Sequence, residues 1–396
     1  FAMLIPHCEG AIEEFAKLLQ QELDAYPLSM NLLLAFGVYP VDGVCAPVDV
    51  MCDRANIAIR KVKGNYNQHI AYYDAEMRSA LMAEQTVLNE MEWALETQQF
   101  ILYFQPKYDL PTGAIIGAEA LVRWQHPQKG LILPGAFIPV FENNGFITRL
   151  DGYVWERTCQ VLQGWLAAGA HPLPVSVNIS RVNFYDPTLC DRLVALVKQY
   201  ELTPNLLELE LTESAYTENP QQLIAVTKEL QRNGFVILMD DFGSGYSSLN
   251  MLKDVPVDIL KIDLGFLECN ANAGRGCNIL SSVVRMAKWL DIPVIAEGVE
   301  TCEQVNFLRG IGCNSAQGYY YSKPVPQDVY EALLAKQDST VPEFPSVSPV
   351  CENFDLSELL NPHSTINLLF NSFSDSVGIY EFYGEKLEAL RVNEGY

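Results

Sequence analysis

The sequence predicts an α/β protein built around a (β/α)8 barrel. Between residues 100 and 336, short apolar segments alternate with amphipathic segments at intervals of roughly thirty residues. Eight of the apolar segments have strand character, and acidic or amide residues recur where they end. Eight strands alternating with helices over about 240 residues are typical of a (β/α)8 barrel. A doubly wound open sheet remains the alternative, because periodicity alone does not show whether a sheet closes.

The first 74 residues are expected to form an incomplete α+β unit, and a polar helix is expected to follow over 75–99. Three strands and two helices are too little for a closed domain. The strands are expected over 1–6, 32–40 and 67–74, and the helices over 11–23 and 48–64. In the following helix, apolar residues at roughly helical spacing predict a connector between two domains: Leu81, Val87, Leu88, Met91 and Leu95.

The barrel is expected to occupy residues 100–336. Its eight strands are FILYFQP (100–106), IIGAEALVRW (115–124), PVSVNIS (174–180), LLELELT (206–212), FVILMDD (235–241), ILKID (259–263), PVIAEGV (293–299) and AQGYYYS (316–322). The clearest helices between them cover 155–169, 189–200, 221–234 and 281–291. In the first of these, Trp155, Cys159, Leu162 and Leu166 form one apolar stripe.

After the barrel, residues 337–362 contain four prolines and are expected to form an extended linker. Residues 363–396 are expected to form a helix and a hairpin around Tyr383 and Gly384. This last piece resembles the beginning of a PAS-type sensor domain.

Composition excludes several classes of function. The 49 acidic and 26 basic residues give a net charge of −23, which argues against binding of duplex nucleic acid and means that a phosphorylated ligand would need metal ions. No apolar run is long enough to span a membrane, and residues 1–6 are too short for a signal peptide. The ten cysteines are scattered without paired spacing, which favours reduced thiols and a cytoplasmic location.

The most informative feature is the set of polar residues at the strand ends. Because the carboxyl ends of barrel strands converge on one mouth, residues distant in sequence are expected to meet there. Crowded carboxylates need compensation, and carboxylate and amide oxygens suit Mg²⁺ or Mn²⁺. The set comprises Glu119, Asn178, Glu210, Glu213, Asp240, Asp241, Lys261, Asp263, Glu297, Glu300 and Gln317.

Simpler interpretations exist for each feature alone. A single acid after a strand is more often a helix cap or a solvated loop charge. The segment DDFGSGYSSL, residues 240–249, can be an ordinary Gly-Ser turn, and it is not a phosphate-binding P-loop because no Gly-Lys-Ser/Thr follows. His126 and His171 precede prolines and are expected at the surface.

Taken in order, the motifs resemble those of the EAL-domain cyclic-di-GMP phosphodiesterases. The resemblance covers residues 88–336, nearly the whole barrel. It implies hydrolysis of cyclic di-GMP to linear pGpG by two metal ions, on a barrel whose first strand runs antiparallel to the rest. The matching blocks are EALVRW (119–124), LILPGAFIPVFENNGFI (131–147), SVNIS (176–180), ELTES (210–214), MDDFGSGYSSL (239–249), VDILKIDLGF (257–266), VIAEGVET (294–301) and AQGYYYSKPV (316–325).

The resemblance also implies a role for each matching residue. It implies that Lys261 holds or activates the attacking water and that Glu297 is a second candidate for the base. It also implies a catalytic role for Asp241, which with Asp240 and Glu297 serves the metal pair and its bridging water, and it implies that Glu213 anchors the loop of residues 241–248. The implied metal ligands are Glu119, Asn178, Glu210, Asp240, Asp241 and Glu297. The implied substrate contacts are Gln105, Leu121, Arg123, which reaches a phosphate, and the late active-site residue Gln317.

No catalytic position is substituted, which favours an enzyme over the competing hypothesis of a non-catalytic cyclic-di-GMP receptor. One departure lies after Ser180, where Arg181, Val182 and Asn183 differ from the usual small residue followed by arginine. Residues 1–74 resemble the second half of a GGDEF diguanylate cyclase domain without its signature, so they predict no cyclase activity. We also expect a homodimer formed through the barrel.

Overall fold

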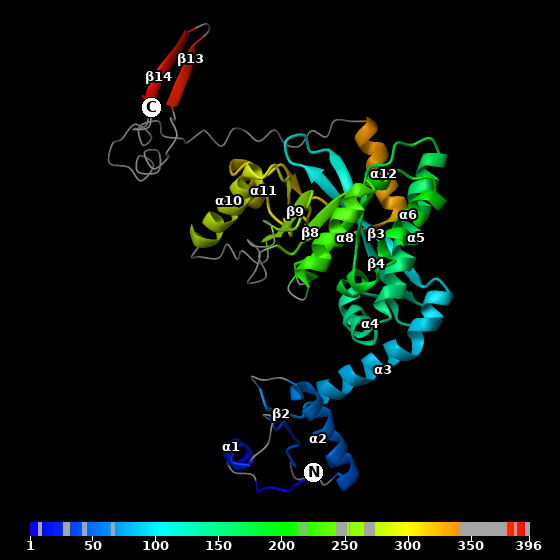
Figure 1. The fold of residues 1–396 in the computed structure, drawn as a ribbon, viewed down its shortest axis with the longest axis vertical. Helices are drawn as coiled ribbons and strands as arrows, with labels where there is room; N and C mark the ends of the chain where they lie inside the picture. The colour runs from blue at the N-terminus through cyan, green and yellow to red at the C-terminus, as the bar shows by residue number, and fades with distance from the viewer. Residues whose placement is uncertain are drawn as a thin grey trace. The chain divides into compact units, whose positions relative to one another are not determined.

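Eight strands of the protein close into a barrel in the computed structural model (Figure 1). The structure describes residues 1–6, 10–26, 32–41, 46–64, 68–213, 215–216, 219–242, 252, 254–264, 274–339, 378–383 and 386–392. These residues belong to two compact units, Phe1–Gln337 and Asp338–Tyr396, and each unit is described by itself.

The barrel is closed because its first strand pairs on both sides. The neighbouring strands follow in the order β3, β11, β10, β9, β8, β7, β6 and β4, and β4 pairs with β3 again. β3 is antiparallel to both neighbours, whereas the other pairs are parallel. The barrel and its antiparallel first strand are therefore confirmed, and the open-sheet alternative is wrong. The strands are β3 Phe100–Asp109, β4 Ile115–His126, β6 Val175–Asn178, β7 Leu207–Thr212, β8 Ile237–Asp240, β9 Ile259–Asp263, β10 Val294–Glu297 and β11 Ser315–Ala316.

Amphipathic helices surround these strands (Figure 1). On α5, Trp155, Cys159 and Leu162 are buried as expected, but Leu166 is exposed and Trp165 is buried in its place. The α-helices are α4 Ile138–Asn144, α5 Ile147–Ala167, α6 Leu189–Gln199, α8 Pro220–Arg232, α10 Gly274–Trp289, α11 Cys302–Gly310 and α12 Gln327–Ser339. Short 3₁₀ turns cover η1 Pro134–Ala136, η2 Arg181–Tyr185 and η3 Pro204–Leu206, and the short strands β5 Gly130–Ile132 and β12 Val325–Pro326 pair with β4 and β3.

The eighth strand is much shorter than the expected AQGYYYS segment. Only Ser315 and Ala316 pair with their neighbours, and the chain then turns at Gly318. A Cβ atom at Gly318 would lie 2.2 Å from the carbonyl oxygen of Val299. The backbone at Gly318 therefore lies too close to the loop that follows β10 for any side chain to fit. The run of tyrosines has strand composition, but it lies in this turn.

Residues before the barrel form a small α/β layer. α1 Ala11–Asp24 and α2 Val48–Val62 are present, and β1 Phe36–Val38 pairs in parallel with β2 Ile70–Tyr72. α2 packs against β1 at Gly37, where a Cβ atom would lie 2.0 Å from the Ala55 carbonyl oxygen. The strand expected over 1–6 is wrong, because this segment pairs with neither strand of the layer.

The connector and the tail are helix and hairpin, respectively. α3 spans Ala75–Glu96, and the Asp74 side chain caps it by accepting a hydrogen bond from Glu76 N at 3.2 Å. In the second unit, β13 Gly378–Tyr383 and β14 Lys386–Val392 form the expected antiparallel hairpin. The extended linker was expected to begin at residue 337, but residues 337–339 belong to α12, and the rest of that linker and the helix expected before this hairpin lie outside the described residues. Among the residues that are described, none of the helices is long and apolar enough to cross a bilayer.

Candidate functional site

The parallel strands bring four carboxylates to one mouth of the barrel. Glu210, Asp240 and Glu297 lie at or near the carboxyl ends of β7, β8 and β10, and Glu119 lies on β4. The registers place these positions near the same end of the barrel but stagger them: Asn178 on β6 stands opposite Glu210, whereas Asp240 stands opposite Thr212 and Glu297 opposite Asp263. The period-two alternation of strands then directs the preceding and following apolar residues away from the barrel interior.

Lys261 of β9 lies at the centre of these carboxylates. Its Nζ atom is 2.5 Å from Glu297 Oε1, 2.6 Å from Glu210 Oε2, 3.3 Å from Glu119 Oε2 and 3.4 Å from Asp240 Oδ1. Lys261 is only 1% exposed. One buried ammonium group therefore balances part of the negative charge of four carboxylates, each on a different strand.

A network of amides extends the site from Glu119. Gln317 Nε2 donates to Glu119 Oε2 at 2.7 Å and to Gln105 Oε1 at 3.1 Å. Asn178 Nδ2 donates to the other oxygen, Glu119 Oε1, at 3.2 Å. Two predicted residues, Gln317 and Asn178, thus donate to the Glu119 carboxylate, and Gln317 directly follows the short eighth strand Ser315–Ala316.

The ionisation of the site follows from burial and crowding. Burial alone would lower the pKa of Lys261, but the four surrounding carboxylates raise it well above its usual value. Burial raises the pKa of Asp240 to about 7 and that of Glu297 well above its usual value, against the attraction of Lys261. Burial also opposes ionisation of Glu210, but Lys261 and Lys107 hold its pKa below the usual value. Two effects therefore reduce the negative charge of the cluster: the positive charge of Lys261, and the raised proton affinity of Asp240 and Glu297.

The donor set suits hard divalent cations. Its oxygens come from carboxylates and amides, as Mg²⁺ and Mn²⁺ prefer, and two of its buried oxygens, Glu210 Oε1 and Gln317 Oε1, accept no hydrogen bond within the described part of the chain. In that same part, no three acidic, histidine or cysteine side chains are already arranged as a metal centre. Four of the carboxylates are instead turned toward the Lys261 ammonium.

Two predicted residues adjoin this cluster without a resolved role. Asp241 has a left-handed backbone with φ 57°, and its N–H donates to Asp240 Oδ1 at 2.9 Å. Glu213 is buried, being 3% exposed. Of the loop that Glu213 is expected to anchor, residues 241–248, only Asp241 and Phe242 belong to the described residues, so this anchoring stays a prediction.

The expected substrate contacts line the same strand pair. Gln105 stands opposite Glu119, and Tyr103 stands opposite Leu121, in the β3–β4 register. Arg123 follows Leu121 on the same face of β4, with its guanidinium carbon 5.6 Å from the centre of the Tyr103 ring. Leu121 and Arg123 thus extend outward from the cluster along one face.

Sequence reasoning missed a second buried lysine. Lys107 of β3 lies 2.8 Å from Glu208 Oε2 and 3.6 Å from Glu210 Oε1, on the other side of Glu210 from Lys261. Glu208 and Glu210 share one face of β7, and that alternation of acids along a buried strand is the signal that could have revealed the pair.

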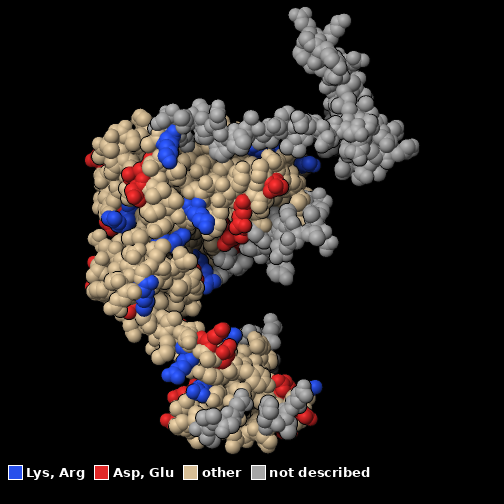
Figure 2. All heavy atoms as spheres, turned by 180° about the vertical axis from the view of Figure 1, so that it is seen from behind, with Lys and Arg blue, Asp and Glu red and all other residues tan. Residues whose placement is uncertain are grey.

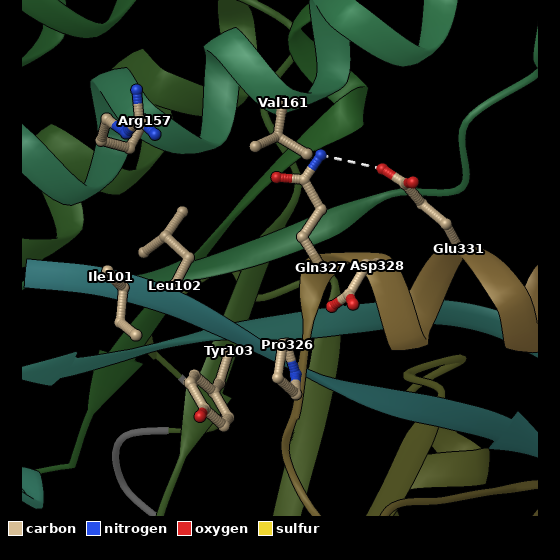
Figure 3. A pocket seen from close by; sticks show the side chains of 9 residues that line it. All are labelled: Ile101, Leu102, Tyr103, Arg157, Val161, Pro326, Gln327, Asp328 and Glu331. Carbon is tan, nitrogen blue, oxygen red and sulfur yellow. Dashed lines mark hydrogen bonds between the residues drawn. The ribbon is translucent and has the colours of Figure 1, made fainter. Parts of the chain in front are cut away.

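A separate pocket of about 430 Å³ lies between β3, α5 and the start of α12 (Figure 3). Gln327 donates to Glu331, one turn further along α12, at 2.8 Å, and Arg157 and Val161 of α5 line the pocket from the other side. None of the four carboxylates around Lys261 lines it. Figure 2 shows acidic and basic side chains in small scattered groups on one face, with no continuous basic surface among the residues described there.

A closed barrel with an antiparallel first strand and a mouth of carboxylates around one lysine defines a TIM-like barrel protein with a polyanionic site. The EAL domain family model matches residues 88–324. The chain belongs to the EAL domain family.

Several relatives are similar over most of this chain. It is 33% identical over 342 residues, or 85% of its length, to the bifunctional diguanylate cyclase/cyclic di-GMP phosphodiesterase MucR of Pseudomonas aeruginosa, and these residues cover 50% of that protein. It is 35% identical over 312 residues, or 79% of its length, to the cyclic di-GMP phosphodiesterase NbdA of the same organism, covering 40% of that protein. The chain thus spans half or less of the length of these curated relatives.

Solved structures give the same fold. The PaMucR phosphodiesterase in complex with c-di-GMP is 38% identical, with a TM-score of 0.59 over 62% of this chain and 99% of that one. The EAL enzyme Bd1971, bound to cAMP and cyclic-di-GMP, is 29% identical, with a TM-score of 0.60 over 72% of this chain and 74% of that one.

Proposed function

We propose that this chain hydrolyses cyclic di-GMP to linear pGpG and depends on two Mg²⁺ or Mn²⁺ ions. The observation that supports this most directly is the convergence of four carboxylates from four strands on Lys261. Glu119, Asn178, Glu210, Asp240, Asp241 and Glu297 would hold the ions. When bound, such ions neutralise a phosphodiester and lower the pKa of a water molecule.

The protein's own groups bind and orient the reactants. Gln105, Leu121 and Arg123 bind cyclic di-GMP along β3 and β4, and Arg123 faces a phosphate. Lys261 holds the attacking water by donating hydrogen bonds, and Glu297, 2.5 Å from Lys261, is the candidate base that accepts its proton. Gln317 keeps the Glu119 carboxylate oriented, and Glu213 anchors the loop that carries Asp241.

The remaining parts of the proposal concern the setting of the barrel. Residues 1–74 are the second half of a GGDEF-like domain, and residues 363–396 begin a PAS-like domain. The protein acts in the cytoplasm as a homodimer through the barrel. Exposed Ile279 and Trp289 on α10 support an apolar contact of that kind.

The test is an assay of the purified chain with cyclic di-GMP and Mg²⁺ or Mn²⁺, with the products separated by chromatography. Light scattering measures the mass of the protein in solution and so tests the proposed homodimer. Formation of pGpG that stops on chelation of the metal is expected. Tight binding of cyclic di-GMP without any product would replace the enzyme by a receptor.

Lys261→Ala separates catalysis from binding. In the metal-loaded protein, Lys261 acts on the water more than on the bound ligand, so its removal should lower turnover by about two to four powers of ten. Affinity for cyclic di-GMP, measured by calorimetry with Ca²⁺, should stay within about tenfold, or 1.4 kcal/mol. Equal losses of rate and affinity would make Lys261 a binding residue.

A further inference from the structure

We propose that Asp151 and Trp155 of α5 are positioning residues that fix the segment 178–183 and thereby aim the Asn178 amide into the metal site. Neither side chain contacts the carboxylate cluster directly. They act on the backbone that follows β6. The inference rests on the proposed function, because it requires Asn178 to serve a bound cation.

Trp155 holds the start of this segment. Its indole Nε1 donates to the carbonyl oxygen of Asn178 at 3.1 Å. The ring is 2% exposed, and Arg192 of α6 lies over it at 5.6 Å from the ring centre. A buried, packed indole leaves the Asn178 carbonyl little freedom to rotate.

Asp151 holds the end of the segment, one helical turn before Trp155 on the same face of α5. Its Oδ2 atom accepts hydrogen bonds from the Ser180 N–H at 2.8 Å and from Asn183 Nδ2 at 2.7 Å. Asp151 is 7% exposed and Asn183 is fully buried. Burying a carboxylate is unfavourable unless it is hydrogen-bonded. Movement of the segment would break these hydrogen bonds, so they favour its present position.

A third anchor joins the segment to the carboxylates themselves. Ile179 N donates to the Glu210 carbonyl oxygen at 3.0 Å, and Asn178 Nδ2 donates to Glu119 Oε1 at 3.2 Å. α5 therefore fixes the backbone on both sides of Ile179, while the Asn178 side chain remains exposed at the mouth. Groups that orient a ligand in this way typically change metal affinity about 10- to 100-fold when removed.

The experiment measures Mn²⁺ affinity by calorimetry, without substrate, for the full chain and for its W155F, D151A and D151N variants. Trp155→Phe keeps a ring but cannot donate, and Asp151→Ala removes the acceptor, so each should weaken Mn²⁺ binding by about 10- to 100-fold. Asp151→Asn should bind nearly as the parent does, because one amide oxygen can accept both hydrogen bonds that reach Oδ2. Thermal unfolding without metal verifies that each variant is folded, and Trp155→Phe carries the test if Asp151→Ala is not.

Thr158→Val is the matched control. Thr158 is fully buried on the same helix, and its hydroxyl donates to Val154 O at 2.8 Å, within α5. It should lose stability without losing Mn²⁺ affinity. If the parent binds Mn²⁺ and both W155F and D151A bind it equally well, or if T158V weakens binding as much as they do, this inference alone is overturned. If the parent binds no Mn²⁺, the proposed function fails together with it.

Discussion

Lys261 is the residue on which the electrostatics of the mouth depend. Four carboxylates lie within 3.4 Å of its ammonium group, so it acts as an internal counter-ion that allows the strands to bring these acids together. Burial is the main cause that raises the pKa of Asp240 and of Glu297, and the neighbouring carboxylates raise both further against the attraction of Lys261. A divalent cation would have to displace protons from these carboxyls and compete with Lys261 for their oxygens.

Asp151 makes a prediction about pH. Burial raises its pKa to about 6, against the hydrogen bonds from Ser180 and Asn183. A folded-state pKa above the unfolded value means that the native state binds the proton more tightly, so this group's contribution to stability falls as pH rises through 6. Between pH 5 and 8 the loss should be about 1.4 kcal/mol, the equivalent of one pKa unit.

Asp151→Asn has no such titration and is the comparison for this measurement. Urea unfolding of both proteins without metal should show the Asn variant gaining on the parent by about that amount from pH 5 to pH 8. A constant difference between the two proteins over this range would show that Asp151 does not titrate there.

Single residues were predictable where strand topology determines their place. Residues at the ends of parallel strands converge whatever their sequence distance, so Glu119, Glu210, Asp240, Lys261 and Glu297 could be grouped in advance. Residues whose place depends on another helix could not. The prediction that His126 lies at the surface is wrong, because this residue is 4% exposed and its Nε2 atom lies 2.9 Å from Glu90 Oε2 of α3.

Among the elements, the turn after β11 is the one whose geometry most constrains the site. Gly318→Ala should destabilise the protein by about 1–3 kcal/mol, because the added Cβ would lie 2.2 Å from the Val299 carbonyl oxygen and 2.3 Å from its nitrogen. The shift should also move Gln317, which donates to Glu119, and so weaken Mn²⁺ binding. Chemical denaturation and calorimetry measure the two effects.

Gly310→Ala is the control for this change. Gly310 ends α11, and a Cβ atom there would meet nothing within 4 Å, so alanine should be neutral or slightly stabilising. Equal stability of the two variants would contradict the close contact at Gly318.

The limits of element prediction have a physical cause. The alternation of apolar residues in strands and their helical spacing in helices located most elements, because both patterns indicate which face of an element is buried. They did not reveal that the eighth strand contains only two residues, because tyrosine is enriched in strands, whereas the turn depends on the close approach of Gly318 to Val299. Closure depends on β3 pairing with both β4 and β11, a long-range pairing that no local pattern encodes.

At the scale of the whole molecule, the barrel interior is crossed by an ion pair. Lys107 on β3 and Glu208 on β7 are not neighbours in the sheet order, yet they lie 2.8 Å apart. Both are largely buried, at 2% and 8% exposed. The pair therefore joins opposite walls of the closed barrel below the carboxylate cluster, and closure of the barrel is what brings Lys107 to the acids of β7.

This pair makes the last prediction, which a double-mutant cycle tests without metal. Lys107→Met should lower the free energy of unfolding by about 3–5 kcal/mol, because it leaves Glu208 buried and uncompensated. The double variant with Glu208→Met should recover much of this loss, because an apolar pair has no buried charge to desolvate. The exposed pair Arg149 and Glu92, at 50% and 53% exposed, is the control, and its coupling should be only about 0–1 kcal/mol. If the two substitutions at Lys107 and Glu208 simply add, within about 0.5 kcal/mol, the walls are not coupled through this pair.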